Sequence, residues 1–196
     1  MTYKHNQDSV YKRKFILTFD DGPSPKTTLP LLDILATHNI KVVFFMLGKS
    51  LDTPQGAAVA HYAYDQGHII GNHTYSHKNL PLLTKKEIRG EIELTHNLIC
   101  DITGDCKYFR PPYRSTNIDI NSISEEFEYE TILWNVDSLD WKLKKNGKWV
   151  DHTIAQIENM NDCTILMHDI HMSTIHYIDE LIMYIKSLSG HYFSLI

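Results

Sequence analysis

The chain has 196 residues, of which 42% are hydrophobic, so it can fill one sizeable core but has no room for a second full domain. Its 19 lysines and arginines stand against 24 acidic residues, which gives a formal charge of −5. No basic tract interrupts the sequence, and we therefore expect neither nucleic acid nor an anionic membrane as a partner.

No stretch is apolar for long enough to cross a bilayer. The longest purely apolar run, Val42–Leu47, falls far short of the roughly 20 residues that a transmembrane helix needs. A polar leader, residues 1–13, has no apolar stretch behind its charges and does not read as a secretory signal. We expect a cytoplasmic protein, or one from which a leader has been removed, and the sequence leaves the oligomeric state open.

The three cysteines form neither a disulfide framework nor a closely spaced metal-binding pair. An odd number leaves at least one thiol free. Small buried or surface thiols are the simplest interpretation, and a bridge between Cys100 and Cys106 stays open.

Residues 14–196 carry no internal repeat or linker and are taken as one domain. In the first half, apolar runs alternate with segments of helical periodicity. Thr84-Lys-Lys-Glu87 is a capping box, because each side chain can satisfy a free amide at the start of a helix. The predicted strands are Phe15–Phe19 and Val42–Leu47, and the predicted helices are Thr28–His38, Ala57–Asp65 and the capped segment through Ile99.

The second half continues the alternation. Ser122-Ile-Ser-Glu125 is a weaker version of the capping signal. The pattern as a whole predicts an α/β fold in which helices wrap parallel strands. The strands predicted here are Thr131–Val136, Thr164–Met167 and a short Tyr192–Leu195, and the helices are Thr153–Met160 and Ile175–Leu188.

Chemically active side chains follow three of these strands. Asp20 and Asp21 follow the first strand, Asp137 to Trp141 follow a second, and His168-Asp169 follow a third. Because the carboxyl ends of parallel strands meet at one edge, we expect these side chains to gather there. The two adjacent aspartates can share a site only if the strand breaks at Gly22-Pro23, since in a continuing strand they point to opposite faces. An ordinary solvated turn is the alternative.

His73-Thr-Tyr-Ser-His77 places two imidazoles four residues apart. On one turn of a helix this spacing brings both rings to the same face, where they can hold one metal ion together with a carboxylate. Twelve histidines occur in the chain, so surface or hydrogen-bonded core histidines are the simpler alternative.

Three further segments have both a structural and a chemical interpretation. Arg110 stands between an aromatic residue and two prolines, which fix the backbone and can aim the guanidinium at a carboxylate; a rigid loop with an exposed arginine is the alternative. The segment Trp134–Trp141 combines acids with aromatics, and Leu166-Met-His-Asp169 ends a strand in a histidine beside an acid. Each alone fits a structural role, but together they supply the parts of a metal-assisted amide hydrolase.

These segments resemble, in order, the five motifs of the polysaccharide deacetylase family, which is the NodB homology domain of carbohydrate esterase family 4. The resemblance covers about residues 14–196. Within the family, the chain most resembles the chitooligosaccharide deacetylases in form. The resemblance implies a distorted (β/α) barrel with seven or eight strands. The motifs are Thr18-Phe-Asp-Asp-Gly-Pro23, His73-Thr-Tyr-Ser-His77, Arg110-Pro-Pro-Tyr113, Asp137-Ser-Leu-Asp-Trp141 and Leu166-Met-His-Asp169.

The resemblance also implies a role for each motif. Asp21, His73 and His77 would bind one divalent metal ion, usually zinc, with cobalt or nickel as substitutes. Asp20 would be the general base and Arg110 would hold it in place. His168 would protonate the leaving amine, and Asp140 would pair with that imidazole.

Other residues are implied to bind the substrate. The backbone amide of Tyr113 would help to stabilise the oxyanion, and Trp141 and Ile170 would line a pocket for the acetyl methyl group. Two positions depart from the family: Arg114 stands where glycine is common, and Ile170 where leucine is usual. Arg114 is interpreted either as a recognition site for an acidic group or as a change of loop shape.

The first functional hypothesis is a metal-dependent deacetylase of an N-acetylglucosamine-containing saccharide, either a chitooligosaccharide or a small amino sugar. The aromatic residues Tyr113, Trp141 and Trp149 are expected to stack against sugar rings. A hydrolase of another C–N bond, such as a formamide or cyclic amide, is the alternative, although the acid and base motifs are intact. A non-catalytic carbohydrate-binding module is disfavoured by the intact metal ligands.

Overall fold

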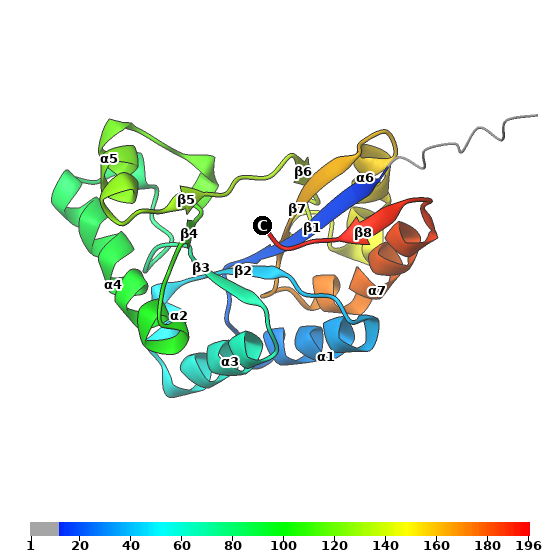
Figure 1. Ribbon diagram of the computed structural model, residues 1–196, viewed down its shortest axis with the longest axis horizontal. Helices are drawn as coiled ribbons and strands as arrows, with labels where there is room; N and C mark the ends of the chain where they lie inside the picture. The colour runs from blue at the N-terminus through cyan, green and yellow to red at the C-terminus, as the bar shows by residue number, and fades with distance from the viewer. Residues whose placement is uncertain (1–11) are drawn as a thin grey trace, which may run out of the picture.

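The computed structural model describes residues 12–196, so the leader predicted over residues 1–13 lies almost entirely outside the described part. All strand pairs in this part are parallel, and the strands form one curled sheet in the order β5-β4-β3-β2-β1-β7-β6, with β8 beside the start of β1 (Figure 1). The strands are β1 Arg13–Asp20, β2 Val43–Met46, β3 Ile69–Asn72, β4 Tyr108–Phe109, β5 Glu130–Thr131, β6 Val136–Asp137, β7 Asp162–His168 and β8 His191–Phe193.

Helices surround the outside of the curled sheet (Figure 1). This arrangement confirms the predicted α/β fold, in the form of an open, distorted (β/α) barrel. No helix in the described residues is both long and apolar enough to span a membrane. The α-helices are α1 Thr28–His38, α2 Gly48–Leu51, α3 Pro54–Asp65, α4 Lys85–Thr103, α5 Ile118–Glu126, α6 Lys148–Ile157 and α7 Met172–Ser187, and the short 3-10 helices are η1 Leu80–Leu82, η2 Pro112–Arg114 and η3 Lys145–Gly147.

The central strand β1 separates two apolar regions by its alternation. Phe15, Leu17 and Phe19 belong to the large core shared with the surrounding helices. Ile16 belongs to a smaller cluster with Val43 and Phe45 of β2. Because successive side chains of a strand point to opposite faces, Asp20 lies on the same face as Ile16, the inner face of the barrel.

The barrel stays open where the sequence predicted a continuous strand over Thr131–Val136. That prediction is wrong: β5 and β6 are two short strands at opposite ends of the strand order, joined by residues 132–135. The amide of Ile132 donates to the carbonyl of Phe109 beside β4, whereas the amide of Asn135 donates to the carbonyl of Thr164 in β7. One segment therefore crosses from one edge of the sheet to the other and cannot pair with either edge along its length.

The capping box at Thr84 is confirmed, whereas the weaker one at Ser122 is wrong. The Thr84 hydroxyl accepts from the amide of Glu87, the Glu87 carboxylate accepts from the amide of Thr84, and α4 follows at once. Helix α5 instead begins after Asn117, whose side chain accepts from the amide of Ile120, so Ser122 lies inside it.

Helix α6 begins five residues before the predicted start at Thr153. The earlier turn contains Trp149, which is 0% exposed and packs in the main core, so the expectation that Trp149 stacks on a sugar is wrong. Trp149, Thr153 and Ile157 are all buried and lie four residues apart, which is the spacing of one helix face. Trp141, in contrast, is 49% exposed.

The two tryptophans should respond differently to truncation. We expect Trp149→Ala to lower the free energy of unfolding by about 3–5 kcal/mol, because it removes a large buried side chain. Trp141→Ala should change it by about 0.5 kcal/mol. Urea unfolding followed by circular dichroism measures both, and equal effects of the two variants would contradict the assignment of Trp149 to the core.

Candidate active site

The two adjacent aspartates are brought to one site by a break in β1. Asp20 is the last residue of the strand and faces the barrel interior, and Asp21 adopts a φ of 78°, which ends the alternation. A Cβ on Gly22 would come within 2.1 Å of the Asp169 carboxylate, so only glycine fits there. Asp169 itself accepts a hydrogen bond of 2.5 Å from the hydroxyl of Thr28. The distorted turn predicted from Gly22-Pro23 is therefore present, and it is packed against the end of β7.

The two histidines follow β3 in a loop, so their expected placement on a helical turn is wrong. Thr74 and His77 have positive φ angles of 69° and 60°. The side chain of Asn72 accepts from the amide of Thr74 at 2.8 Å, and the hydroxyl of Thr74 accepts from the amide of His77 at 3.2 Å. The rings of His73 and His77 nevertheless meet, with centroids 5.0 Å apart.

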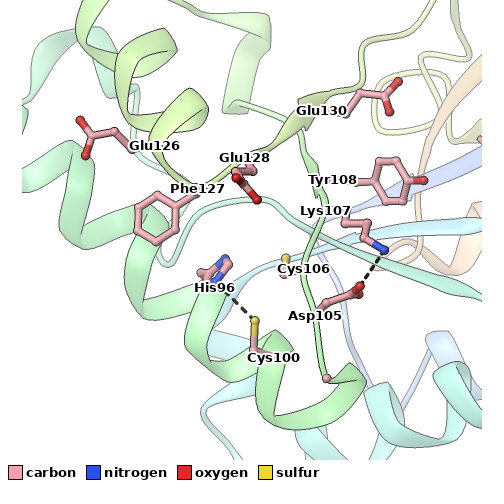
Figure 2. A pocket seen from close by; sticks show the side chains of 11 residues that line it. His96, Cys100, Asp105, Cys106, Lys107, Tyr108, Glu126, Phe127, Glu128 and Glu130 are labelled. Atoms are coloured by element: carbon pink, nitrogen blue, oxygen red, sulfur yellow. Dashed lines mark hydrogen bonds and ion pairs between the residues drawn. The ribbon is translucent and has the colours of Figure 1, made fainter.

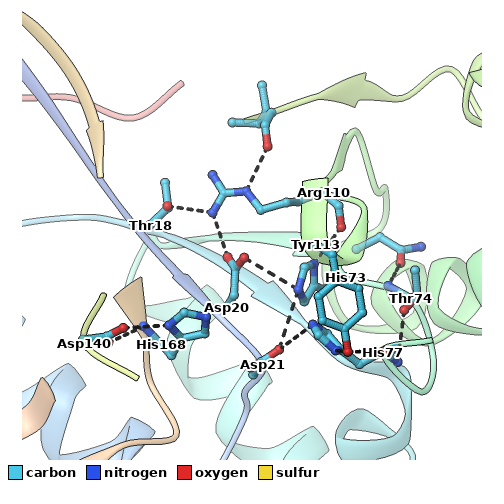
Figure 3. A network of polar contacts seen from close by, with 12 residues as sticks. Thr18, Asp20, Asp21, His73, Thr74, His77, Arg110, Tyr113, Asp140 and His168 are labelled. Carbon is cyan, nitrogen blue, oxygen red and sulfur yellow. Dashed lines mark hydrogen bonds and ion pairs between the residues drawn. The ribbon is translucent and has the colours of Figure 1, made fainter. Parts of the chain in front are cut away.

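Asp21, His73 and His77 offer ligand atoms to one point (Figure 3). The Oδ1 atom of Asp21 lies 3.6 Å from Nε2 of His73 and 3.4 Å from Nε2 of His77. This oxygen is buried and has no hydrogen-bond partner among the described residues. All three ligand atoms lie within 4.8 Å of one another. A divalent cation would satisfy the orphaned oxygen, and this donor set of two nitrogens and one oxygen fits it.

The protonation state of His73 suits a ligand. Its Nδ1 donates to the backbone carbonyl of Arg110 at 2.6 Å, which leaves the lone pair of Nε2 directed at Asp21. Burial lowers the pKa of His73 to about 3, so the imidazole is neutral at physiological pH. A neutral histidine held through its other nitrogen is the form that binds a metal.

Asp20 is held by a fully buried arginine. Nη1 of Arg110 donates to Oδ1 of Asp20 at 2.7 Å and to the hydroxyl of Thr18 at 2.8 Å, and the guanidinium lies 4.1 Å from the ring centre of Phe45. Arg110 is 0% exposed, so the alternative of an exposed loop arginine is wrong. Burial raises the pKa of Asp20, and the charge of Arg110 acts in the opposite direction.

His168 is paired with Asp140, which lies in the turn after the neighbouring strand β6. His168 is the register partner of Asp20 between β7 and β1, so both side chains leave the sheet at the same level. Nδ1 of His168 donates to Oδ1 of Asp140 at 2.7 Å, and the other oxygen of Asp140 accepts from the hydroxyl of Thr174 at 2.6 Å. Burial disfavours the charged imidazole, but the hydrogen bond and the charge of Asp140 outweigh it and raise the pKa of His168 to about 9.

These groups meet in one cavity of about 400 Å³, a volume suited to a small ligand. Of the predicted site residues, Asp20, Asp21, His73, His77, Tyr113, Trp141, His168 and Ile170 line it. Arg110 and Asp140 contact the lining residues from behind. Arg114 does not line the cavity, and its guanidinium lies 5.7 Å from the ring centre of Trp134, which does.

Three residues of the site were not among the predicted site residues. His171 lines the cavity with its ring centroid 5.9 Å from that of His168, yet it is one more histidine before a helix. Thr174 binds Asp140 across 34 residues, and no spacing rule connects the two. Thr18 lies within the first motif, and its alternation with Asp20 along β1 is the signal that places it on the same face.

A second hollow, of about 620 Å³, lies away from these motifs at the starts of β4 and β5 (Figure 2). It is lined by Cys100, Cys106 and several glutamates, and all three cysteines of the chain are free thiols. The bridge that the sequence left open between Cys100 and Cys106 is thus absent. Burial raises the pKa of Cys106 to about 12, so this thiol is not a nucleophile near neutral pH.

Comparison with known proteins places the fold in one class, the carbohydrate deacetylases of the NodB type. The family model described as polysaccharide deacetylase matches residues 7–132, more than half of the chain. The chain belongs to the polysaccharide deacetylase family.

Three relatives illustrate the match. Peptidoglycan-N-acetylglucosamine deacetylase PgdA of Listeria monocytogenes is 34% identical over 179 residues, 89% of this chain and 36% of PgdA. Chitin deacetylase 1 of Saccharomyces cerevisiae is 36% identical over 135 residues, 68% of this chain and 42% of that protein. The structure of peptidoglycan deacetylase PdaC from Bacillus subtilis is 31% identical with a TM-score of 0.83, covering 94% of this chain and 88% of that one. The chain therefore spans less than half the length of PgdA and less than half the length of chitin deacetylase 1.

The His168–Asp140 pair predicts a pH-dependent stability. The folded-state pKa of about 9 lies above the ordinary value of 6.5, so the stabilisation is complete below about pH 6.5 and is lost as the pH rises through about 9. The loss should be about 3 kcal/mol at most. Urea unfolding between pH 6 and 10 measures this loss in chelator-treated wild type and His168→Gln. The difference between their free energies of unfolding should narrow as the pH rises. A difference that does not change with pH would contradict the elevated pKa.

Proposed function

We propose that this chain is a metal-dependent hydrolase that removes N-acetyl groups from saccharides containing N-acetylglucosamine. One observation carries the proposal: a buried carboxylate held by an arginine and a histidine held by a carboxylate line the same cavity as the Asp-His-His donor set. A base, an acid and a cation site in one cavity are what the hydrolysis of an amide requires.

Asp21, His73 and His77 would hold the metal ion, for which we propose zinc, with cobalt and nickel as substitutes. Such an ion, when bound, polarises a carbonyl oxygen and lowers the pKa of a water molecule. No other group of three such side chains in residues 12–196 is close enough to act as a second site.

Asp20 is the proposed general base. It would accept the proton of the water that attacks the acetamide carbonyl, and its burial makes the carboxylate more basic. Arg110 keeps one oxygen of Asp20 occupied at 2.7 Å and so fixes the orientation of the other, which lies 3.6 Å from Nε2 of His73. The water oxygen ends in the released acetate.

His168 is the proposed general acid. Its elevated pKa keeps it protonated near neutral pH, and it would donate that proton to the amine as the C–N bond breaks. Asp140 and Thr174 hold the imidazole in this orientation. We further propose that the backbone amide of Tyr113 binds the oxyanion and that Trp141 and Ile170 contact the acetyl methyl group.

The substrate is proposed from chemistry that the relatives share. Their names specify N-acetylglucosamine in peptidoglycan, N-acetylmuramic acid in peptidoglycan, and chitin. Each of the three is, or is built from, an N-acetylated amino sugar, which supports an N-acetylated saccharide as the partner of this chain. Within that class we propose a chitooligosaccharide or a smaller amino sugar, and a cytoplasmic location stays a prediction.

A hydrolase of formamides or cyclic amides is the alternative on the same fold. The intact pairs Asp20–Arg110 and His168–Asp140 favour the deacetylase. A carbohydrate-binding module without catalysis would have no need of the buried, unpartnered oxygen of Asp21 between two histidines.

The proposal is tested by acetyl release. Mass spectrometry should detect the loss of acetyl groups from a panel that runs from N-acetylglucosamine to chitohexaose and includes peptidoglycan fragments, formamides and cyclic amides. We expect release with zinc-loaded protein and none after treatment with a chelator. Saccharide binding without release by the metal-loaded protein would favour the binding module, and turnover of the formamides alone would favour the alternative hydrolase.

The acidic members of the panel test the role of Arg114. Its guanidinium is exposed above Trp134, and no carboxylate among the described residues lies within ion-pair distance. If Arg114 recognises an acidic group, Arg114→Gln should raise KM for fragments containing N-acetylmuramic acid and leave KM for chitooligosaccharides unchanged. Equal effects on both would assign Arg114 to loop shape.

The base and the ligands should separate in variants. We expect Asp20→Asn to retain zinc and to lose turnover by about 10²–10⁴-fold, because only proton transfer is removed. His73→Ala should lose both zinc and turnover. Metal analysis by mass spectrometry and acetyl release measure the two effects, and a fully active Asp20→Asn variant would refute the base assignment.

A further inference from the structure

The loop that carries the two histidines holds a backbone conformation that its sequence does not favour. This histidine loop, residues 73–78, contains positive φ angles at Thr74 and His77, neither of which is glycine. For a β-branched residue such as threonine this is rare. Such a conformation persists only where surrounding groups hold it.

The two halves of the histidine loop are held by different elements. The carbonyls of Thr74 and Tyr75 accept from the amides of Gly48 and Lys49 in α2, both at 2.9 Å. These contacts hold the first half, which contains His73. The second half contains His77, whose amide donates to the Thr74 hydroxyl within the loop, and it is also bound by a side chain of helix α4.

Glu91 of α4 binds the histidine loop on both sides of His77. Its Oε2 accepts from the amide of Ser76 at 2.7 Å, and its Oε1 accepts from the Ser76 hydroxyl at 2.6 Å. Nζ of Lys78 lies 3.2 Å from the same Oε1. Ser76 and Lys78 are the residues immediately before and after His77. One buried carboxylate therefore binds the backbone and hydroxyl of the residue before a proposed metal ligand and the ammonium group of the residue after it.

The position of Glu91 separates it from the reacting groups. It is absent from the lining of the active-site cavity, and its contacts are with the loop and not with the ligand atoms themselves. Hydrogen bonds to a carboxylate are stronger than those between neutral groups, so they can offset the cost of the unusual backbone. Tyr113 contacts His77 from the other side: its hydroxyl lies 3.2 Å from Nδ1 of the ring and donates to the backbone carbonyl at the longer distance of 3.5 Å.

We propose that Glu91 is a positioning residue that sets His77 as a metal ligand by binding Ser76 and Lys78. The inference rests on the proposed metal site but not on any substrate. Residues that orient metal ligands from outside typically contribute 10- to 100-fold to metal affinity.

The test compares Glu91→Gln with Glu93→Gln in the full chain. Glu93 is exposed on the same helix, so its variant controls for the loss of one charge. The dissociation constant for zinc is measured by competition with a chromogenic chelator, and the geometry of the site is followed by the visible absorption of bound cobalt. We expect Glu91→Gln to weaken zinc binding about 10- to 100-fold and to change the cobalt spectrum. Glu93→Gln should match wild type in both.

Two milder variants guard against a folding defect. Ser76→Ala removes one hydrogen bond and Lys78→Gln removes the ion pair, and both leave the amide of Ser76 on Glu91. We expect both variants to lose less zinc affinity than Glu91→Gln does. Their metal-free forms should unfold at the same urea midpoint as metal-free wild type. For every weakened variant, saturating zinc should restore kcat with KM unchanged.

The outcomes are distinct. Wild-type zinc affinity in Glu91→Gln, or a loss of affinity matched by an equal loss in Glu93→Gln, would overturn the positioning role. Wild-type protein that binds zinc and shows the expected losses in its variants, yet releases no acetyl group, would overturn the proposed function alone. Wild-type protein that binds no divalent metal would overturn both.

Discussion

The buried ion pair between Arg110 and Asp20 is the constraint on which the rest of the site depends. Both charges lie out of water inside the barrel, and removing ions from water costs several kcal/mol each unless hydrogen bonds and attraction offset it. Two further acceptors therefore bind the guanidinium of Arg110. The hydroxyl of Thr18 accepts from Nη1, and the carbonyl of Ile132 accepts from Nε at 2.9 Å. Ile132 begins the segment that crosses the open side of the sheet. The ion pair thus ties the centre of the sheet to the segment that bridges its two edges.

Arg110 also couples the proposed base to the proposed metal site through its backbone. Its amide donates to the carbonyl of Asn72, and its own carbonyl accepts from His73, which fixes the tautomer of that ligand. The side chain of Asn72 meanwhile shapes the turn at Thr74. The orientation of the Asp20 carboxylate and the lone pair of His73 are consequently set by one residue at the end of β4, so a displacement of β4 would disturb both proposed functions together.

The sequence predicted the strand ends well because their signals are local. The apolar runs of β1 and β7 end in the polar pairs Asp20-Asp21 and His168-Asp169, which mark where these strands stop. Strand alternation then fixes which face each side chain takes. The loop conformation at Thr74 and His77 was not predictable, because positive φ angles at non-glycine residues arise from contacts with α2 and α4. Residues 132–135 were likewise read as a strand because their composition is apolar, and only their two different partners show otherwise.

The residues proposed for the reaction and those proposed to contact the sugar lie on different parts of this fold. Asp20 and His168 are register partners on adjacent strands, so the backbone of the sheet fixes their separation, and their neighbours suit them to the opposite roles proposed for them. Arg110 supplies a donor to Asp20, whereas Asp140 supplies an acceptor to His168. Tyr113 and Trp141, in contrast, lie outside the strands and are exposed. Because loops tolerate change and paired strands do not, the residues at the strand ends identify the reaction more firmly than the loops identify the sugar.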